Sequence, residues 1–117
     1  LAYLTVPGTL TTATMTGAAA IATNTIYTVN YGAAIGSTDF SVAGATGFGL
    51  LFGGGKAFGT TVTTGDDFLI IVQGTDKTVL LAVENPAATT LANTDIDAVV
   101  TLTGVTNSAV FEAGNFI

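Results

Sequence analysis

Residues 66–84 of the chain read DDFLIIVQGTDKTVLLAVE, and this stretch decides the fold. Two apolar runs, residues 68–72 and 78–83, flank Gly74-Thr75-Asp76, whose residue types favour a tight turn. Both runs are rich in Val, Ile and Leu and are almost continuous in apolar residues, which is typical of central strands covered on both faces. The sequence therefore predicts a buried β-hairpin at the centre of a sheet.

Further short strands are expected around this hairpin. Residues 9–15 and 25–31 alternate between two faces, and residues 95–103 alternate with Ile96, Ala98, Val100 and Leu102 predicted to face inward. Shorter strand-like segments are found at residues 2–6, 39–43, 47–55 and 56–64. Many short strands separated by turn residues predict an all-β fold, namely a single-domain antiparallel β-sandwich or jelly roll with short Gly/Thr-rich turns over residues 1–117.

The composition excludes several classes of function. The net charge is −6 with only two basic residues, which argues against nucleic-acid binding because phosphate contacts need cations. The longest apolar runs are strand-sized, so we expect no membrane span. The chain has no Cys and no His, which removes thiolate chemistry and the commonest general base. We therefore expect no catalytic residues and no enzyme activity.

Acidic side chains are the only plausible metal ligands. If the hairpin centres on Thr75, Asp66 and Asp67 lie opposite Glu84 and Val83 at its open end. Asp95 and Asp97 share one face of their predicted strand. Carboxylates gathered in this way would suit Ca²⁺, which prefers oxygen ligands. The predicted calcium site comprises Asp66, Asp67, Glu84, Asp95 and Asp97; the alternative is that these are ordinary solvated carboxylates at strand ends.

The first six residues form a candidate assembly segment ahead of the turn pair Pro7-Gly8. They are Leu1, Ala2, Tyr3, Leu4, Thr5 and Val6. Such a segment can be donated as a strand to a neighbouring subunit, or it can form an edge strand of its own sheet. Because the chain begins at Leu1 rather than Met, we expect either a processed terminus or the end of a fragment.

Three segments of the second half carry a resemblance to a known group of proteins. Residues 67–72 read DFLIIV, residues 95–105 read DIDAVVTLTGV, and the chain ends in Asn115-Phe116-Ile117. Together, residues 67–117 resemble the C-terminal regions of bacterial proteins exported by type I secretion, such as RTX adhesins, serralysin-type proteases and some S-layer proteins. The resemblance implies export through an ABC-type channel, an uncleaved C-terminus and an extracellular or cell-surface location.

Low charge and abundant Thr, Gly and Ala are also typical of surface-layer and fibre subunits. The sequence thus predicts a non-enzymatic extracellular structural protein that assembles with itself into a filament, surface layer or matrix. Two alternatives remain open at this point. One is a viral capsid decoration or fibre protein on the virion surface, and the other is a calcium- or carbohydrate-binding module of a larger adhesin.

Overall fold

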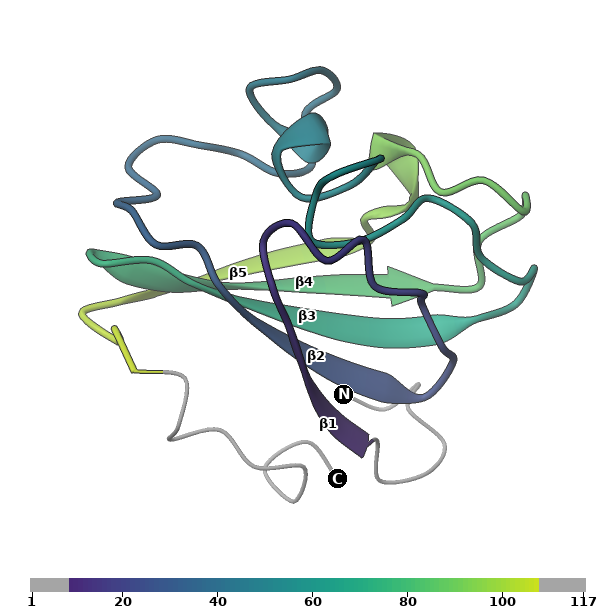
Figure 1. Cartoon of the computed structure of the whole chain (residues 1–117), viewed down its shortest axis with the longest axis horizontal. Coiled ribbons are helices and arrows are strands. Elements are labelled where there is room, and N and C mark those ends of the chain that lie inside the picture. The colour runs from purple at the N-terminus through teal and green to yellow at the C-terminus, as the bar shows by residue number, and fades with distance from the viewer. Residues whose placement is uncertain (1–8, 108–117) are drawn as a thin grey trace.

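The structure, a computed structural model, describes residues 9–107. Its strands form one five-stranded sheet in the order β1-β2-β3-β4-β5 (Figure 1). The strands are β1 (Thr9–Ala13), β2 (Thr25–Asn30), β3 (Asp67–Gln73), β4 (Lys77–Glu84) and β5 (Ala98–Thr103). Two single-turn 3₁₀ helices, η1 (Phe48–Leu50) and η2 (Asn93–Asp95), lie in the connections. The described chain is thus mostly strand and loop with almost no helix, which agrees with the all-β class.

The sheet is mixed, so the prediction of a purely antiparallel sheet was wrong. β1 pairs with β2 and β2 pairs with β3 in parallel, whereas β3–β4 and β4–β5 are antiparallel. Strand direction was misjudged because an apolar run is equally compatible with parallel and antiparallel neighbours, whereas direction is set by the connections. Within residues 9–107 there is no second sheet, so the structure does not confirm a sandwich or jelly roll.

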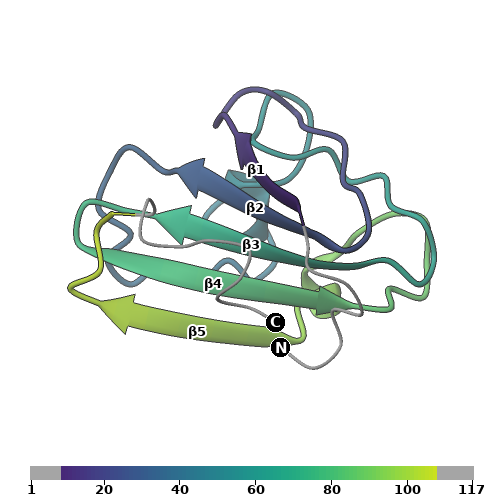
Figure 2. The ribbon, with the colours of Figure 1, turned by 90° about the horizontal axis from the view of Figure 1, so that it is seen from below.

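Long irregular connections replace the second layer of a sandwich. Residues 14–24, 31–66 and 85–97 lie on one side of the sheet, which we call the first face (Figures 1 and 2). The strands expected at residues 39–43 and 56–64 are absent, and only isolated bridges form, such as Phe52 with Phe58. Within residues 47–55, Phe48–Leu50 form a 3₁₀ turn instead of a strand, and further along Gly53 (φ 129°) and Gly55 (φ 72°) adopt positive φ values outside the extended region.

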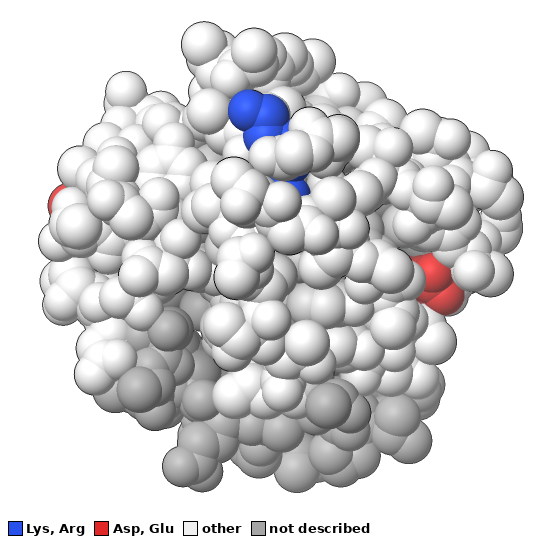
Figure 3. All heavy atoms as spheres, viewed as in Figure 1, with Lys and Arg blue, Asp and Glu red and all other residues white. Residues whose placement is uncertain are grey.

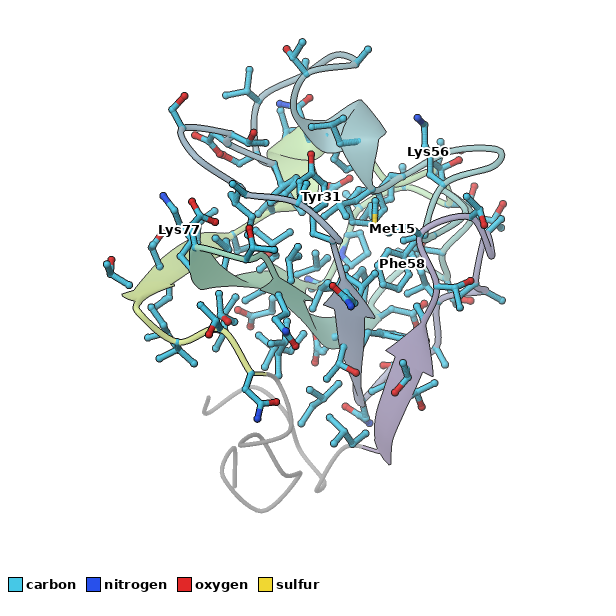
Figure 4. All side chains as sticks on the ribbon, turned by 60° about the vertical axis from the view of Figure 1, so that its left-hand side comes forward. Met15, Tyr31, Lys56, Phe58 and Lys77 are labelled. Carbon is cyan, nitrogen blue, oxygen red and sulfur yellow. The ribbon has the colours of Figure 1, made fainter. Side chains whose placement is uncertain are left out.

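The main core lies between the first face and these connections. Tyr27 packs edge-on against Phe58, with ring centroids 5.2 Å apart, and the Tyr27 hydroxyl donates a hydrogen bond to the carbonyl of Ala20 (3.1 Å). Figure 4 shows Met15 and Phe58 between the loops and the sheet, whereas Lys56 and Lys77 point outward. The irregular layer is therefore held by aromatic packing and by hydrogen bonds from strand side chains.

The opposite side of the sheet, which we call the second face, is also apolar. Its central cluster comprises Ile26, Leu69, Ile71 and Ala82, all buried, with the partly buried Leu80 packed against them. The five middle residues of β3 are buried on both faces, which confirms the prediction of a central hairpin. Residues of β3 and β4 alternate between the first-face and second-face clusters, so one continuous apolar run supplies two cores.

The centre of the hairpin turn lies half a residue from its predicted position, which shifts the pairing of the two strands by one residue. Gln73 pairs with Thr78, and the N–H of Gly74 donates to the carbonyl of Lys77 (2.9 Å), so the turn centres between Thr75 and Asp76. Asp67 therefore faces Glu84, and the predicted pairing of Asp66 with Glu84 was wrong. A two-residue loop is the commonest hairpin connection, and the three-residue Gly-Thr-Asp reading misplaced the register.

Gly74 provides a test of how tightly the turn packs against the connection after β2. A methyl group added to Gly74 would lie 2.7 and 2.9 Å from two carbons of the buried Ile35 side chain. We expect Gly74→Ala to destabilise the fold by about 1–3 kcal/mol through overpacking. Urea unfolding at equilibrium measures this change.

The matched control is Gly54→Ala, because a methyl group there has no atom within 4 Å. Its effect should stay within about 1 kcal/mol. In the Ile35→Ala background the Gly74→Ala penalty should shrink, because the clashing atoms are removed. An unchanged penalty in that background would mean that the clash with Ile35 is not the cause.

Candidate functional site

The turn of the hairpin is clamped to the connection that follows β2. Asp76 accepts hydrogen bonds from the backbone N–H groups of Ile35 (2.8 Å) and Gly36 (2.9 Å). These two bonds lower the pKa of the Asp76 carboxyl, the bond from Ile35 contributing most. Lys77 donates from Nζ to the carbonyl of Gly36, so its ammonium also holds this loop. Both charged groups of the turn are therefore used to position the backbone.

A shallow depression of about 260 Å³ lies beside this clamp and reaches strand β5. Its lining residues are Gly36, Ser37, Thr38, Asp39, Phe40, Lys77, Val79, Val99 and Thr101. The Asp39 carboxylate accepts hydrogen bonds from the hydroxyl and the N–H of Ser41, and the hydroxyl contributes most to lowering the pKa of Asp39. With Asp39 and Lys77 bonded in this way, the depression offers mainly hydroxyl and apolar groups.

The first two predicted calcium ligands satisfy backbone donors at the open end of the hairpin. Asp66 is buried, and its Oδ2 accepts the N–H of Thr63 at 2.8 Å. Asp67 accepts the N–H of Asn85 through Oδ1 at 3.0 Å. Asn85 has a positive φ of 50°, a conformation that Asn tolerates better than most residues. These carboxylates fix the ends of β3 and β4 by hydrogen bonding.

The remaining predicted ligands behave similarly. Asp97 accepts the N–H of Glu84 at 2.7 Å, which ties the start of β5 to the end of β4. Asp95 lies in η2, not in a strand as predicted, and accepts the N–H of Ala92 at 2.7 Å. The structure thus brings Asp67, Glu84 and Asp97 to one end of the sheet and places Asp95 in a local cap.

Among residues 9–107, no three acidic side chains form a group that could hold a metal ion. The hydrogen bonds explain the positions of Asp66, Asp67, Asp95 and Asp97 without a cation. Calcium binding stays a prediction that the geometry of these side chains does not favour.

Strand β5 is the most exposed regular element of the described chain. Five of its six residues are exposed and Leu102 is half-buried; Val99 and Val100 are 43% and 50% exposed. Within residues 9–107, β5 pairs with β4 alone and therefore forms one edge of the described sheet. The prediction that Ala98 and Val100 face inward was wrong, because they lie on an edge strand whose second-face side chains remain accessible.

One face of the molecule carries few ions. Figure 3 shows that this face is almost entirely uncharged, with isolated Lys groups and isolated acidic groups. β1, the other edge of the sheet formed by residues 9–107, contains no charged residue, and Leu10, Thr11 and Thr12 are exposed. Both edges of the described sheet therefore lack charged side chains.

The predicted assembly segment, Leu1 to Val6, lies outside the described residues. The edge position of β5 was not predicted. Its sequence AVVTLT does carry a signal, because it lacks the charges and prolines that usually protect an edge strand. The Asp76 clamp was also not predicted, and the only signal for it was an Asp within a turn sequence.

Comparison of the chain with known protein families, curated proteins and solved structures finds no match. No helix within residues 9–107 is long and apolar enough to cross a membrane. The resemblance to type I-secreted proteins stays a hypothesis.

The Asp76 clamp predicts a specific pH dependence of stability. The folded-state pKa of Asp76 is lowered, so its contribution is fully present above the ordinary Asp pKa of about 4 and is lost as pH falls through the lowered value. We expect Asp76→Asn to lower the urea midpoint at neutral pH and to differ less from the wild type as pH falls below about 4. Urea titrations of both proteins across this range measure the difference.

Thr75→Ala is the control, since the neighbouring exposed turn residue carries no titratable group. Its difference from the wild type should not change with pH. A difference between Asp76→Asn and wild type that is constant with pH would contradict a role for the Asp76 charge.

Proposed function

We propose that the protein is a self-assembling structural subunit whose copies join through the edges of the sheet. The observation that carries this proposal is the exposed, uncharged edge strand β5 (Ala98–Thr103). An edge strand presents unpaired N–H and C=O groups, which can pair with a strand of another molecule. Proteins that remain monomeric usually protect such edges with Lys, Pro, a bulge or a covering loop.

β5 has none of the side-chain forms of protection. Its sequence contains three β-branched residues in succession, Val99, Val100 and Thr101, which favour extended structure. The net charge of −6 makes two copies repel at long range, but neither β5 nor β1 carries a charged side chain, so no like charges meet at the contact itself. Edge pairing would therefore meet few of the usual barriers.

The second uncharged edge, strand β1, determines which kind of assembly is proposed. β1 (Thr9–Ala13) lies at the opposite side of the sheet and is also uncharged. When two different edges of a molecule join, the contact is heterologous and, unless it closes into a ring, it repeats into an open filament. We propose that β5 of one copy pairs with β1 of the next, giving a filament with a continuous sheet.

The proposed location is extracellular or at a cell surface. It is supported by the resemblance of residues 67–117 to type I-secreted proteins, together with a composition rich in Thr and Gly and poor in charge. Export through a type I channel belongs to the same proposal.

Lysine substitutions at the edges test the assembly. Thr101→Lys places a charge on β5, and Thr11→Lys places one on β1; both positions are exposed. We expect the wild type to form oligomers that lengthen with concentration, and each variant to shift the population to monomers and short oligomers. Sedimentation velocity and electron microscopy measure the size distributions.

Thr64→Lys is the matched control, because it adds the same charge at an exposed position in a loop. It should assemble like the wild type, and all three variants should keep their stability within about 0.5 kcal/mol. A wild-type protein that stays monomeric at every concentration would refute the proposal. If Thr101→Lys alone prevents association, the contact is a closed β5–β5 pair and not a filament.

A further inference from the structure

We infer that the C-terminal residues 108–117 of the same chain dock across the second face of the sheet. The docking surface is the apolar strip formed by Ile26, Leu69, Ile71, Leu80 and Ala82. At the two edges the strip ends in the exposed side chains of Leu10 and Val100, which pair with Ile26 and Leu80. An apolar surface of this kind on a folded chain requires a partner.

The described connections do not provide this partner. The partly buried apolar residues of the connections, among them Met15, Tyr31 and Ile96, pack against the first-face cluster. Of the apolar residues within 9–107, only Leu80, itself a sheet residue, is partly buried against the second-face cluster. Nevertheless, Ile26, Leu69 and Ile71 are at most 1% exposed. Burial this complete at the centre of a face requires a covering segment.

Two hydrogen bonds direct the chain end towards this face. Thr78 and Gln73 are paired neighbours in β4 and β3, and their side chains lie on the second face. Thr78 donates from Oγ1 to the carbonyl of Val105, and Gln73 donates from Nε2 to the carbonyl of Thr106, both at 2.5 Å. Thr78 is fully buried. After β5 the chain therefore turns back over the second face.

The length and composition of the remaining segment fit the surface. Ten extended residues reach roughly 33–36 Å, and a five-stranded sheet is about 19 Å wide, so the segment can cross every strand. Its sequence, SAVFEAGNFI, contains Val110, Phe111, Phe116 and Ile117 and only one charged residue, Glu112. Four apolar side chains with so little charge match a strip made of Ile, Leu and Ala.

Cross-linking in the full chain tests the proposal, because the native sequence has no Cys. Val100→Cys lies on the second face, and Val99→Cys lies next to it on the first face; both positions are exposed. Each is combined with Ala109→Cys or Ala113→Cys and treated with a short bifunctional thiol reagent. We expect the Val100 pairs to link at least about tenfold faster than the Val99 pairs. Links formed in a mixture of ¹⁴N- and ¹⁵N-labelled protein should join residues of one chain, as measured by mass spectrometry.

The outcomes separate the possible occupants. Equal rates for the two faces would overturn the proposal, because the segment would then show no preference for the second face. Linking of Ala2→Cys to Val100→Cys, with none from positions 109 and 113, would assign the face to the N-terminal residues. Links between ¹⁴N and ¹⁵N chains would assign it to a second copy. Because the expected links lie within one chain, they test this docking whether or not the sheet edges assemble.

Discussion

The pairing of β3 with β4 is the interaction on which the rest of the molecule depends. β3 lies in the middle of the sheet, bonded in parallel to β2 and antiparallel to β4. Its residues Phe68 to Val72 are all buried, and they alternate between the two apolar clusters. Without this hairpin neither the aromatic core of the first face nor the apolar strip of the second face would have a central surface.

The few charged groups of this chain act mainly on the backbone. Asp66, Asp67, Asp76 and Asp97 each accept hydrogen bonds from main-chain N–H groups at the ends of strands or in the connections. A bond from a backbone donor to a carboxylate is stronger than one to a neutral acceptor. The irregular connections lack the regular backbone hydrogen bonds of a sheet. Carboxylates accept hydrogen bonds from some of the N–H groups that would otherwise be left without an acceptor. Three of these side chains, those of Asp66, Asp67 and Asp97, led to the prediction of a calcium site from the sequence. Carboxylate oxygens can accept backbone hydrogen bonds or bind a metal ion, and the sequence alone does not distinguish the two uses.

Local patterns predicted the strands that recur in the sheet. Strands were predicted at residues 9–15, 25–31, 68–72, 78–83 and 95–103 from their alternation or apolar runs, and each of these segments overlaps one strand of the sheet. Apart from the antiparallel β3–β4 hairpin, strand directions, neighbours and edges were not predicted, because they depend on where the longer connections return. The alternation of Ala98 and Val100 is the same in an edge strand as in a covered one. The position of Phe58 in a connection was also not predicted. A Phe between Ala57 and Gly59 looks the same whether it packs onto the sheet from a loop or belongs to a strand.

The long connection between β2 and β3 has a consequence for the order of folding. The β3–β4 and β4–β5 pairs join neighbouring segments, whereas the parallel β2–β3 pair closes a loop of roughly 40 residues, about 2 kcal/mol costlier in chain entropy than a short turn. Local pairs form early, so we expect the three-stranded unit β3–β4–β5 to precede the attachment of β2. During that interval the apolar edge of β3 is open to other chains. The chain therefore faces its greatest risk of misassembly before β2 arrives, at an edge that the finished molecule hides.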